Sequence, residues 1–311
     1  MINDIKHNRL LNHKIKDLSN TVKHGKIIRP GNLTKFIFLC GANKSQDCIS
    51  ERRKAISKFA EAKLPHTHFF LAEKMFSTLQ EEEHDENILD IEHFISAFSD
   101  YILIILESPS AFAELGAFSH KELRDKIIVI NDSKFSSEKS FINEGPLRAI
   151  KESKNGKHRL LSYKMSQDGI YKTDAIGDVF TELHQILTEN QTSSKYKKHY
   201  ITENCCNPAQ KPNKFTAMFI HDLIFMTGPI LYKEIVEVLK IVFGTQNFNN
   251  VKKILAILTS FNAIKRDEDF HLYRSIKEST YYNYDFDMSD FISAFRNNTF
   301  KYHPERFLNA S

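Results

Sequence analysis

Residues 101–118 have the sequence Tyr101-Ile-Leu-Ile-Ile-Leu-Glu-Ser-Pro-Ser-Ala-Phe-Ala-Glu-Leu-Gly-Ala-Phe118. The run is apolar up to Leu106, continues through a Ser/Pro loop, and places Glu114 near the start of a helix-forming segment. An apolar run that stops at such a loop is typical of a buried parallel strand. Open α/β sheets bind ligands at the carboxyl ends of their strands. Glu114 is therefore expected at a ligand site, as a nucleophile, a base or a charge that stabilises the start of its helix.

The segment belongs to a longer alternation of strands and helices. We predict buried strands over 34–40, 68–71, 101–106 and 126–130, with a weaker one over 159–163. Helical stretches are predicted between and after them, at 46–63, 87–98, 111–124, 139–153 and 172–190. Strands that alternate with helices of this length imply right-handed crossovers. The fold class is therefore α/β, a Rossmann-like or flavodoxin-like parallel sheet with helices on both faces.

The last hundred residues have a different pattern. Three helices are predicted at 214–226, 230–243 and 248–261, and residues 263–274 alternate as a β-hairpin does. Three helices followed by a hairpin is the order of a winged-helix domain, which is mainly helical. Four basic residues on its third helix and wing are candidate phosphate contacts: Lys252, Lys253, Lys265 and Arg266. Winged helices also serve in protein contacts, so the domain can bind DNA or protein.

These patterns divide the chain of 311 residues into four parts. We predict an N-terminal helix and arm over 1–33, a catalytic domain over 34–190, a polar linker over 191–212, and the winged-helix-like domain with its tail over 213–311. The formal net charge is +4, and the whole excess lies in residues 190–311, which hold 16 basic and 12 acidic side chains. Such an excess is compatible with a nucleic-acid partner.

Four cysteines, with Cys205 and Cys206 adjacent, match neither a disulfide framework nor a metal-binding spacing. We expect no metal, no tightly bound cofactor and a reducing, cytoplasmic setting. Residues 1–7 lack the apolar core of a signal peptide, and no apolar run approaches the roughly 20 residues that span a bilayer. We therefore expect a soluble protein without membrane association, and a homo-oligomer is compatible with the sequence.

The segment Glu107-Ser-Pro-Ser-Ala-Phe-Ala-Glu-Leu-Gly-Ala-Phe118 resembles the Glu-Leu-Gly segment of nucleoside 2-deoxyribosyltransferases. It is still more similar to the deoxyribosyltransferase-like effectors encoded beside retron reverse transcriptases. Blocks 36–41 and 140–146 extend the resemblance in the same order over about the first half of the chain. It implies that Glu114 attacks the anomeric carbon of a nucleoside and expels the base. It also implies two partners, a retron reverse transcriptase and its msDNA, that restrain the toxic activity until phage infection.

Further candidate substrate contacts follow the first two strands. The turn Cys40-Gly41-Ala42 comes directly after the first strand, where Gly41 lets the backbone approach a ligand. This turn has one Gly and matches neither G-x-G-x-x-G nor a P-loop. Cys40 is better explained as a packed small side chain than as a nucleophile. Glu73 follows the second strand and can bond a ribose hydroxyl or lie on the surface.

Glu107 and Ser108 end the third strand, and Ser110 can hold a phosphate or a sugar hydroxyl. Ser108 stands six residues before Glu114, where most nucleoside 2-deoxyribosyltransferases have an Asp that handles the base. This departure puts base exchange in doubt and leaves room for hydrolysis. Asn143 lies in a block shared with the retron effectors, as a pocket residue or as a turn-forming Asn ahead of Gly-Pro.

Three functions follow from these features. The leading hypothesis is a retron effector toxin that cleaves the N-glycosidic bond of NAD or of a (deoxy)nucleotide through Glu114. Nucleoside salvage by deoxyribosyl transfer is the second, weakened by Ser108 and by the additional C-terminal domain. A non-catalytic regulator that senses nucleotides or binds DNA is the third.

Overall fold

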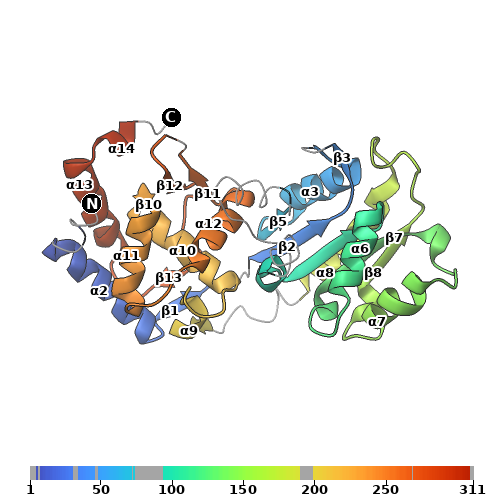
Figure 1. The fold of residues 1–311 in the computed structure, drawn as a ribbon, viewed down its shortest axis with the longest axis horizontal. Coiled ribbons are helices and arrows are strands. Elements are labelled where there is room, and N and C mark those ends of the chain that lie inside the picture. Colours follow the sequence, from blue (N-terminus) through green and yellow to red (C-terminus); the bar gives the residue numbers. More distant parts are fainter. Residues whose placement is uncertain are drawn as a thin grey trace. The chain divides into compact units, whose positions relative to one another are not determined.

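The computed structural model describes residue 5, residues 8–30, 34–45, 48–71, residue 73, and residues 94–189, 199–267 and 269–308. The chain forms two compact units (Figure 1). Described residues between 32 and 194 make up one, called here the α/β unit. Described residues of 1–31 and 195–311 make up the other, called the helical unit. The N-terminal segment therefore belongs with the C-terminal part of the chain.

The α/β unit contains a five-stranded sheet in the order β5-β2-β6-β7-β8. Every neighbouring pair in it is parallel. In chain order this is 2-1-3-4-5, the order of flavodoxin-like sheets, whose ligands bind where the order reverses. The strands are β2 (Lys35–Cys40), β5 (Thr67–Phe70), β6 (Tyr101–Ile105), β7 (Ile127–Asp132) and β8 (Leu160–Tyr163). The reversal lies between β2 and β6, so the carboxyl ends of these two strands form the expected ligand edge.

Helices cover both faces of this sheet. On one face, α3 (Glu51–Lys63) and α8 (Phe180–Thr188) bury Ile56 and Leu183 against Leu39 and its neighbours. Successive strand residues point to opposite faces, so Phe38 faces the other side. There the ring of Phe118, at the end of α6 (Pro109–Phe118), packs edge-on against Phe38 with 5.9 Å between centroids. The predicted α/β class with a helix-flanked parallel sheet is confirmed.

Several predicted boundaries in this unit were wrong. A hairpin of β3 (Asn43–Ser45) and β4 (Cys48–Ile49) occupies the place where a helix was predicted to begin, and α3 starts after its cap at Ser50. The helix predicted over 111–124 ends at Phe118. The one predicted over 139–153 contains a π-helical turn, Asn143–Leu147, before α7 (Arg148–Lys151). Pro146 explains that turn, because it has no N–H to donate to an α-helical ladder.

Two further predictions concern the remainder of this unit. A 3-10 turn, Ala175–Val179, precedes α8 where one continuous helix was predicted over 172–190. The helix predicted over 87–98 is described only from residue 94, where residues 94–98 are helical. Residues 191–198 of the linker predicted over 191–212 lie outside the described residues.

The helical unit holds the predicted helices and hairpin in the predicted order. Its longer helices are α2 (Arg9–Lys23), α10 (Lys214–Thr227), α11 (Tyr232–Phe243), α12 (Asn250–Ser260) and α13 (Met288–Tyr302), and its short ones are α9 (Glu203–Cys206) and α14 (Glu305–Leu308). One antiparallel sheet has the order β10-β12-β11, from Ile230–Leu231, Leu272–Ser275 and Ile264–Arg266. Its strands β11 and β12 form the hairpin that follows α12. The sequence did not predict α13.

The N-terminal helix is amphipathic and packs within the helical unit. Leu11, Ile15 and Leu18 of α2 are fully buried, and the hydroxyl of Ser19 donates to the carbonyl of Val242 at 2.9 Å. The next strand, β1 (Ile27–Arg29), lies between β9 (His199–Ile201) and β13 (Asn283–Tyr284) in a second antiparallel sheet. Residues that are far apart in sequence therefore complete one core.

Candidate functional site

Glu107 organises the ligand edge of the α/β unit. It comes directly after β6, and its side chain is fully buried. One carboxylate oxygen, Oε1, accepts from the amide of Ala42 at 2.9 Å and from the hydroxyl of Ser50 at 2.6 Å. Because Ala42 follows β2, this carboxylate joins the two strand ends at which the sheet order reverses. Glu107 thus shapes the turn after β2, and its contacts are those of a positioning residue.

Gly41 is the close approach in this turn. A Cβ atom at this position would lie 2.9 Å from Glu107 Oε1 and 3.1 Å from Arg53 Cδ. Contacts under 3.0 Å essentially never occur for a real Cβ, so a side chain would displace the carboxylate. The neighbouring Cys40 is buried at the end of β2, with 2% of its surface exposed. Packing therefore accounts for Cys40, and steric exclusion accounts for Gly41.

Arg52 holds the other oxygen of Glu107. Its Nη1 donates to Glu107 Oε2 at 3.1 Å, and its Nε donates to Tyr163 Oη at 2.8 Å and to Asp174 Oδ2 at 2.9 Å. Burial alone would lower the pKa of Arg52, but the hydrogen bonds to the two carboxylates raise it. A guanidinium between two carboxylates in a buried site is a rigid, charge-matched support.

Arg53, the next residue, also supports the turn after β2. It is 1% exposed and donates from Nη1 to Asn43 Oδ1 at 2.7 Å and from Nη2 to the carbonyl of Leu39 at 2.9 Å. The same two nitrogens form a bidentate pair with Glu73 at 2.7 and 3.0 Å. Burial would raise the pKa of Glu73, but Arg53 holds it below its usual value. Both oxygens of Glu73 therefore serve the ion pair with Arg53.

Glu114 lies on α6, the helix that follows β6. The helix begins after its cap at Ser108, so Glu114 is in the second turn and no acidic residue is in the first. The effect of a helix N-terminus falls off within the first turn, so the charge of Glu114 gains little from it. Its side chain is partly buried. The helix places this carboxylate on the same face as Ser110, four residues earlier.

The two serines at the start of α6 are bound to each other. Ser108 accepts from the amide of Ala111 at 3.3 Å, which caps the helix, and its hydroxyl lies 2.9 Å from the hydroxyl of Ser110. Pro109 occupies the first helical position, where a missing N–H costs nothing. The Ser-Pro-Ser segment therefore begins the helix, and its two hydroxyls belong to residues six and four positions before Glu114.

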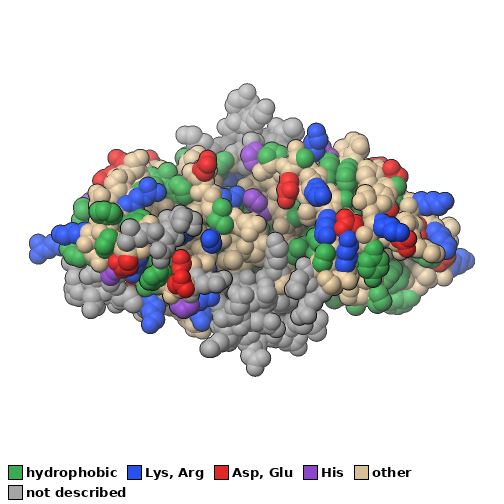
Figure 2. Space-filling model, turned by 90° about the horizontal axis from the view of Figure 1, so that it is seen from above, with side chains coloured by type: hydrophobic (Ala, Val, Ile, Leu, Met, Phe, Trp, Pro, Cys, Tyr) green, Lys and Arg blue, Asp and Glu red, His purple; other side chains and the backbone are tan. Residues whose placement is uncertain are grey.

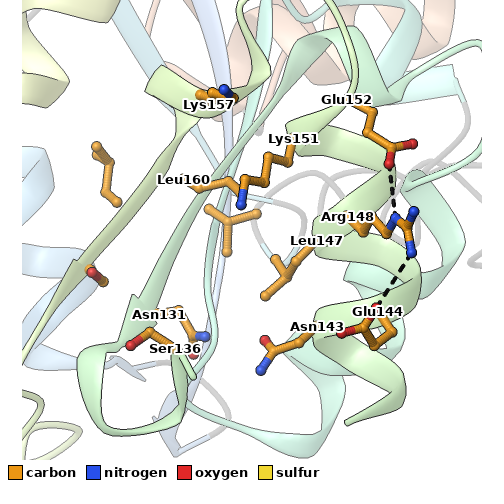
Figure 3. A pocket seen from close by; sticks show the side chains of 13 residues that line it. Asn131, Ser136, Asn143, Glu144, Leu147, Arg148, Lys151, Glu152, Lys157 and Leu160 are labelled. Carbon is orange, nitrogen blue, oxygen red and sulfur yellow. Dashed lines mark hydrogen bonds and ion pairs between the residues drawn. The ribbon is translucent and has the colours of Figure 1, made fainter. Parts of the chain in front are cut away.

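Asn143 belongs to a different part of the unit. Its side-chain amide donates to the carbonyls of Phe135 and Glu138 at 2.8 and 2.6 Å, which braces the loop after β7. It also lines a cavity of about 670 Å³ between β7, β8 and α7 (Figure 3). Figure 3 shows Lys151 extending across this cavity toward Leu160. The lining includes none of the other predicted substrate contacts.

The four predicted nucleic-acid contacts lie near both ends of α12. Lys252 and Lys253 are in the first turn of the helix, and Lys265 and Arg266 follow its far end on β11. Lys265 is exposed, and the other three are partly buried. The two pairs therefore lie on two different elements, the helix and the first strand of the hairpin. On the face drawn in Figure 2, acidic and basic side chains are interspersed.

Local sequence pattern does not predict the arginine supports. The pattern around Arg52 and Arg53 predicts only a helix, and it does not indicate Asp174 and Tyr163 as partners of Arg52. One feature in the sequence pointed to them. Cations are unfavourable near a helix N-terminus, so adjacent arginines in the first turn of α3 indicate side chains that are used elsewhere.

No group of three or more His, Cys, Asp or Glu side chains in the described part of the chain is arranged to hold a metal ion. Within the same residues, no helix is both long enough and apolar enough to cross a bilayer.

Comparisons with known proteins identify the family. Residues 49–266 match the family model described as STM3845 retron effector protein. The chain is 40% identical over 297 residues to the Escherichia coli protein named "Retron Ec73 putative ribosyltransferase/DNA-binding protein", a match that covers 93% of this chain and 92% of that protein. It is 38% identical over 125 residues to "Retron Ec86 putative ribosyltransferase/DNA-binding protein", also from Escherichia coli, which covers 40% of each chain. The chain therefore belongs to the STM3845 retron effector family.

Proposed function

We propose that this retron effector is a toxin whose α/β unit, a nucleoside deoxyribosyltransferase-like domain, cleaves the N-glycosidic bond of NAD or of a (deoxy)nucleotide. Glu114 is the catalytic nucleophile in this proposal. The observation that carries it is the position of Glu114 on α6, the helix that directly follows the strand at the reversal of sheet order. The names of both relatives include "putative ribosyltransferase", which supports a glycosyl-transfer chemistry.

The proposed reaction has two steps. The carboxylate of Glu114 attacks the anomeric carbon, a C–O bond forms, and the C–N bond to the base breaks with its electron pair leaving on the base. A water molecule then attacks the same carbon and releases Glu114, and its proton goes to solvent or to the departed base. Ser108 and Ser110, one turn earlier, are proposed to bind the sugar or its phosphate. Cys40, Gly41, Ala42, Glu73 and Glu107 are proposed to shape the turn that faces the substrate, with Asn143 bracing a more distant wall.

For the helical unit we propose a winged-helix assignment. The order α10, β10, α11, α12, β11, β12 supports it, as does the antiparallel sheet that these three strands form. Lys252 and Lys253 on α12 and Lys265 and Arg266 on the wing are proposed to contact phosphates of msDNA. The reverse transcriptase is the proposed second partner, which restrains the activity in the complex.

The Glu114→Gln variant tests the catalytic assignment. The amide has the same shape but cannot act as an anionic nucleophile, so release of free base from NAD or deoxynucleotides should fall at least about 10³-fold. Base release by the purified protein and growth arrest in cells are the two measurements. Glu122→Gln, at an exposed Glu of the same unit, is the matched control and should retain full activity. Wild-type rates in Glu114→Gln would remove Glu114 from the mechanism.

A further inference from the structure

A second cavity lies wholly within the helical unit, where neither the family nor the proposed reaction assigns a role. Its volume is about 360 Å³, which is within the range of small-molecule sites. It is lined by the end of α10, the Gly228-Pro229 turn, the end of β12, α13 and Phe307. The cavity is thus built from three stretches of the chain, within residues 224–229, 274–277 and 296–307.

The charged side chains that line this cavity are all cationic. They are Arg274, Lys277 and Arg296, and the lining contains no Asp or Glu. Burial lowers the pKa of Lys277 to about 8, which shows that its ammonium has lost much of its hydration. Arg274 also donates to the carbonyl of Arg306, and the ammonium of Lys277 lies 4.5 Å from the ring centroid of Tyr281. Three cations in the lining of one cavity repel one another, so an anion there would be favoured.

The lining contains one hydroxyl, that of Ser275, and a buried pair of hydrogen-bonded side chains holds it in place. Ser275 Oγ lies 2.9 Å from Nε2 of His221, whose Nδ1 lies 3.0 Å from Oδ1 of Asp222. The side chains of His221 and Asp222 are fully buried. Ser275 Oγ also donates to the carbonyl of Lys277 and accepts from its amide, each at 3.1 Å. Ser275 and Lys277 are therefore held together where they line the cavity.

The lining also has apolar residues. They are Ile224 and Phe225 of α10, Pro229 and Phe307. A cavity of this volume is larger than a phosphate ion alone, so it leaves room beside the cations for a sugar or a planar ring. A lining that combines cationic groups with aromatic and aliphatic groups fits a phosphate ester with an apolar portion.

We propose that this cavity binds a phosphate monoester, with Arg274, Lys277 and Arg296 on the phosphate and the apolar lining residues on the attached group. Such a phosphate is carried by a free mononucleotide and by the terminus of an oligonucleotide. The site is distinct from Glu114 and from the four basic residues of α12 and β11. It would let the helical unit respond to a ligand without any change at the proposed catalytic carboxylate.

The test is calorimetric titration of the full-length protein with phenyl phosphate, which has no N-glycosidic bond and so cannot be a substrate for the proposed cleavage. Phenol is the uncharged control probe and should bind at least about 10-fold more weakly. Arg296→Gln and Lys277→Gln should each weaken phenyl phosphate at least about 10-fold, whereas Lys277→Arg should retain binding because it keeps the charge. Lys301→Gln, an exposed cation on α13 outside the cavity, should bind as the wild type does.

A second titration separates the two sources of the phosphate. Oligothymidylate with a terminal 5′-phosphate is compared with the 5′-hydroxyl form. Tighter binding of the phosphorylated form, lost in Arg296→Gln, identifies a nucleic-acid terminus; equal binding of the two forms, with phenyl phosphate bound, identifies a free monoester. Arg296 is exposed, so its replacement should leave the fold intact, as thermal unfolding will show. The proposal is overturned if the wild type does not bind phenyl phosphate, or if Arg296→Gln and Lys277→Gln bind it as Lys301→Gln does.

Discussion

At the scale of single residues, the ligand edge depends on charges that are matched before any substrate arrives. Glu107 accepts from Ala42 and Ser50 on one oxygen and from Arg52 on the other. A buried carboxylate needs such partners, because an unpaired one is strongly disfavoured. These buried side chains therefore hold the turn after β2 rigidly in one geometry.

Gly41→Ala tests this geometry. The added Cβ would lie 2.9 Å from Glu107 Oε1, so the carboxylate or the turn must move. We expect a loss of about 1 to 3 kcal/mol in the free energy of unfolding, as for other overpacked sites, together with weaker substrate binding. Chemical denaturation and the KM for base release are the measurements. Gly116→Ala is the control, since a Cβ there meets no atom within 4 Å; equal stability of the two variants would contradict the steric argument.

The ion pair of Glu73 with Arg53 predicts a pH dependence. The pKa of Glu73 is held below its ordinary value of 4.5, so the folded state binds fewer protons than the unfolded state in this range. The stabilisation is therefore fully present above pH 4.5 and is lost as pH falls through the lower pKa of the folded state. Glu73→Gln should cost about 1 to 2 kcal/mol at neutral pH, discounted because the carboxylate is one-third exposed.

The check is urea denaturation of the wild type and Glu73→Gln across pH. The difference between the two should shrink toward zero in acid, where the wild-type side chain is also protonated. Glu61→Gln, an exposed position on α3, should show no such convergence. A difference that is independent of pH would mean that the ion pair contributes nothing through its charge.

At the scale of elements, α12 and the hairpin after it decide whether the helical unit binds nucleic acid. The Lys pair lies in the first turn of α12, and Lys265 and Arg266 lie on β11 beyond its other end. The Nζ atom of Lys252 also lies 5.7 Å from the ring centroid of Tyr232, so Lys252 has a packing role within the unit as well. The salt dependence of binding therefore measures how many of the four basic side chains contact phosphates.

The variant with Ala at all four basic positions should bind msDNA more weakly and with a flatter salt dependence. Each lost phosphate contact lowers the slope of log K against log salt by about 0.9. Fluorescence anisotropy over a range of salt concentrations measures both quantities. Base release by the isolated protein should hardly change, because these residues are in the helical unit and Glu114 is in the α/β unit.

A matched control has the same change in net charge. It carries Ala at four exposed lysines of the α/β unit, Lys58, Lys63, Lys121 and Lys139. If the control loses as much affinity and slope as the test variant, the binding reflects net charge alone and not contacts from α12 and the wing.

At the scale of the whole molecule, the division into units does not follow the order of the chain. Residues 1–31 precede the α/β unit but belong to the helical unit, where β1 pairs with β9 and β13. A fragment that keeps the N-terminal segment and ends before residue 195 would therefore leave α2 without its packing partners.

We predict that residues 32–194 alone form a folded, monomeric α/β unit. A fragment of residues 1–194 should instead aggregate, because Leu11, Ile15 and Leu18 of α2 would be exposed. Size-exclusion chromatography and near-ultraviolet circular dichroism distinguish the two outcomes. Substituting Leu11, Ile15 and Leu18 by Ser in the longer fragment should restore solubility; a soluble unsubstituted fragment would contradict the argument.

Much of this architecture is determined by local pattern. Continuous apolar runs bounded by loops predict the strands of the parallel sheet, because such strands are buried on both faces. The periodic spacing in residues 214–261 predicts α10, α11 and α12, because the residues on the buried face of a helix recur with its turn. The place of Glu114 after the third strand follows from the same reasoning. The tertiary structure decided the rest: that Glu73 pairs with Arg53, that Glu107 is held by Arg52, that Asn143 braces a loop elsewhere, and that the N-terminal strand completes a sheet with residues near 200 and 284. Such pairings join residues that are distant along the chain, and no local periodicity records them, because each depends on which side chains the folded backbone brings within hydrogen-bonding distance.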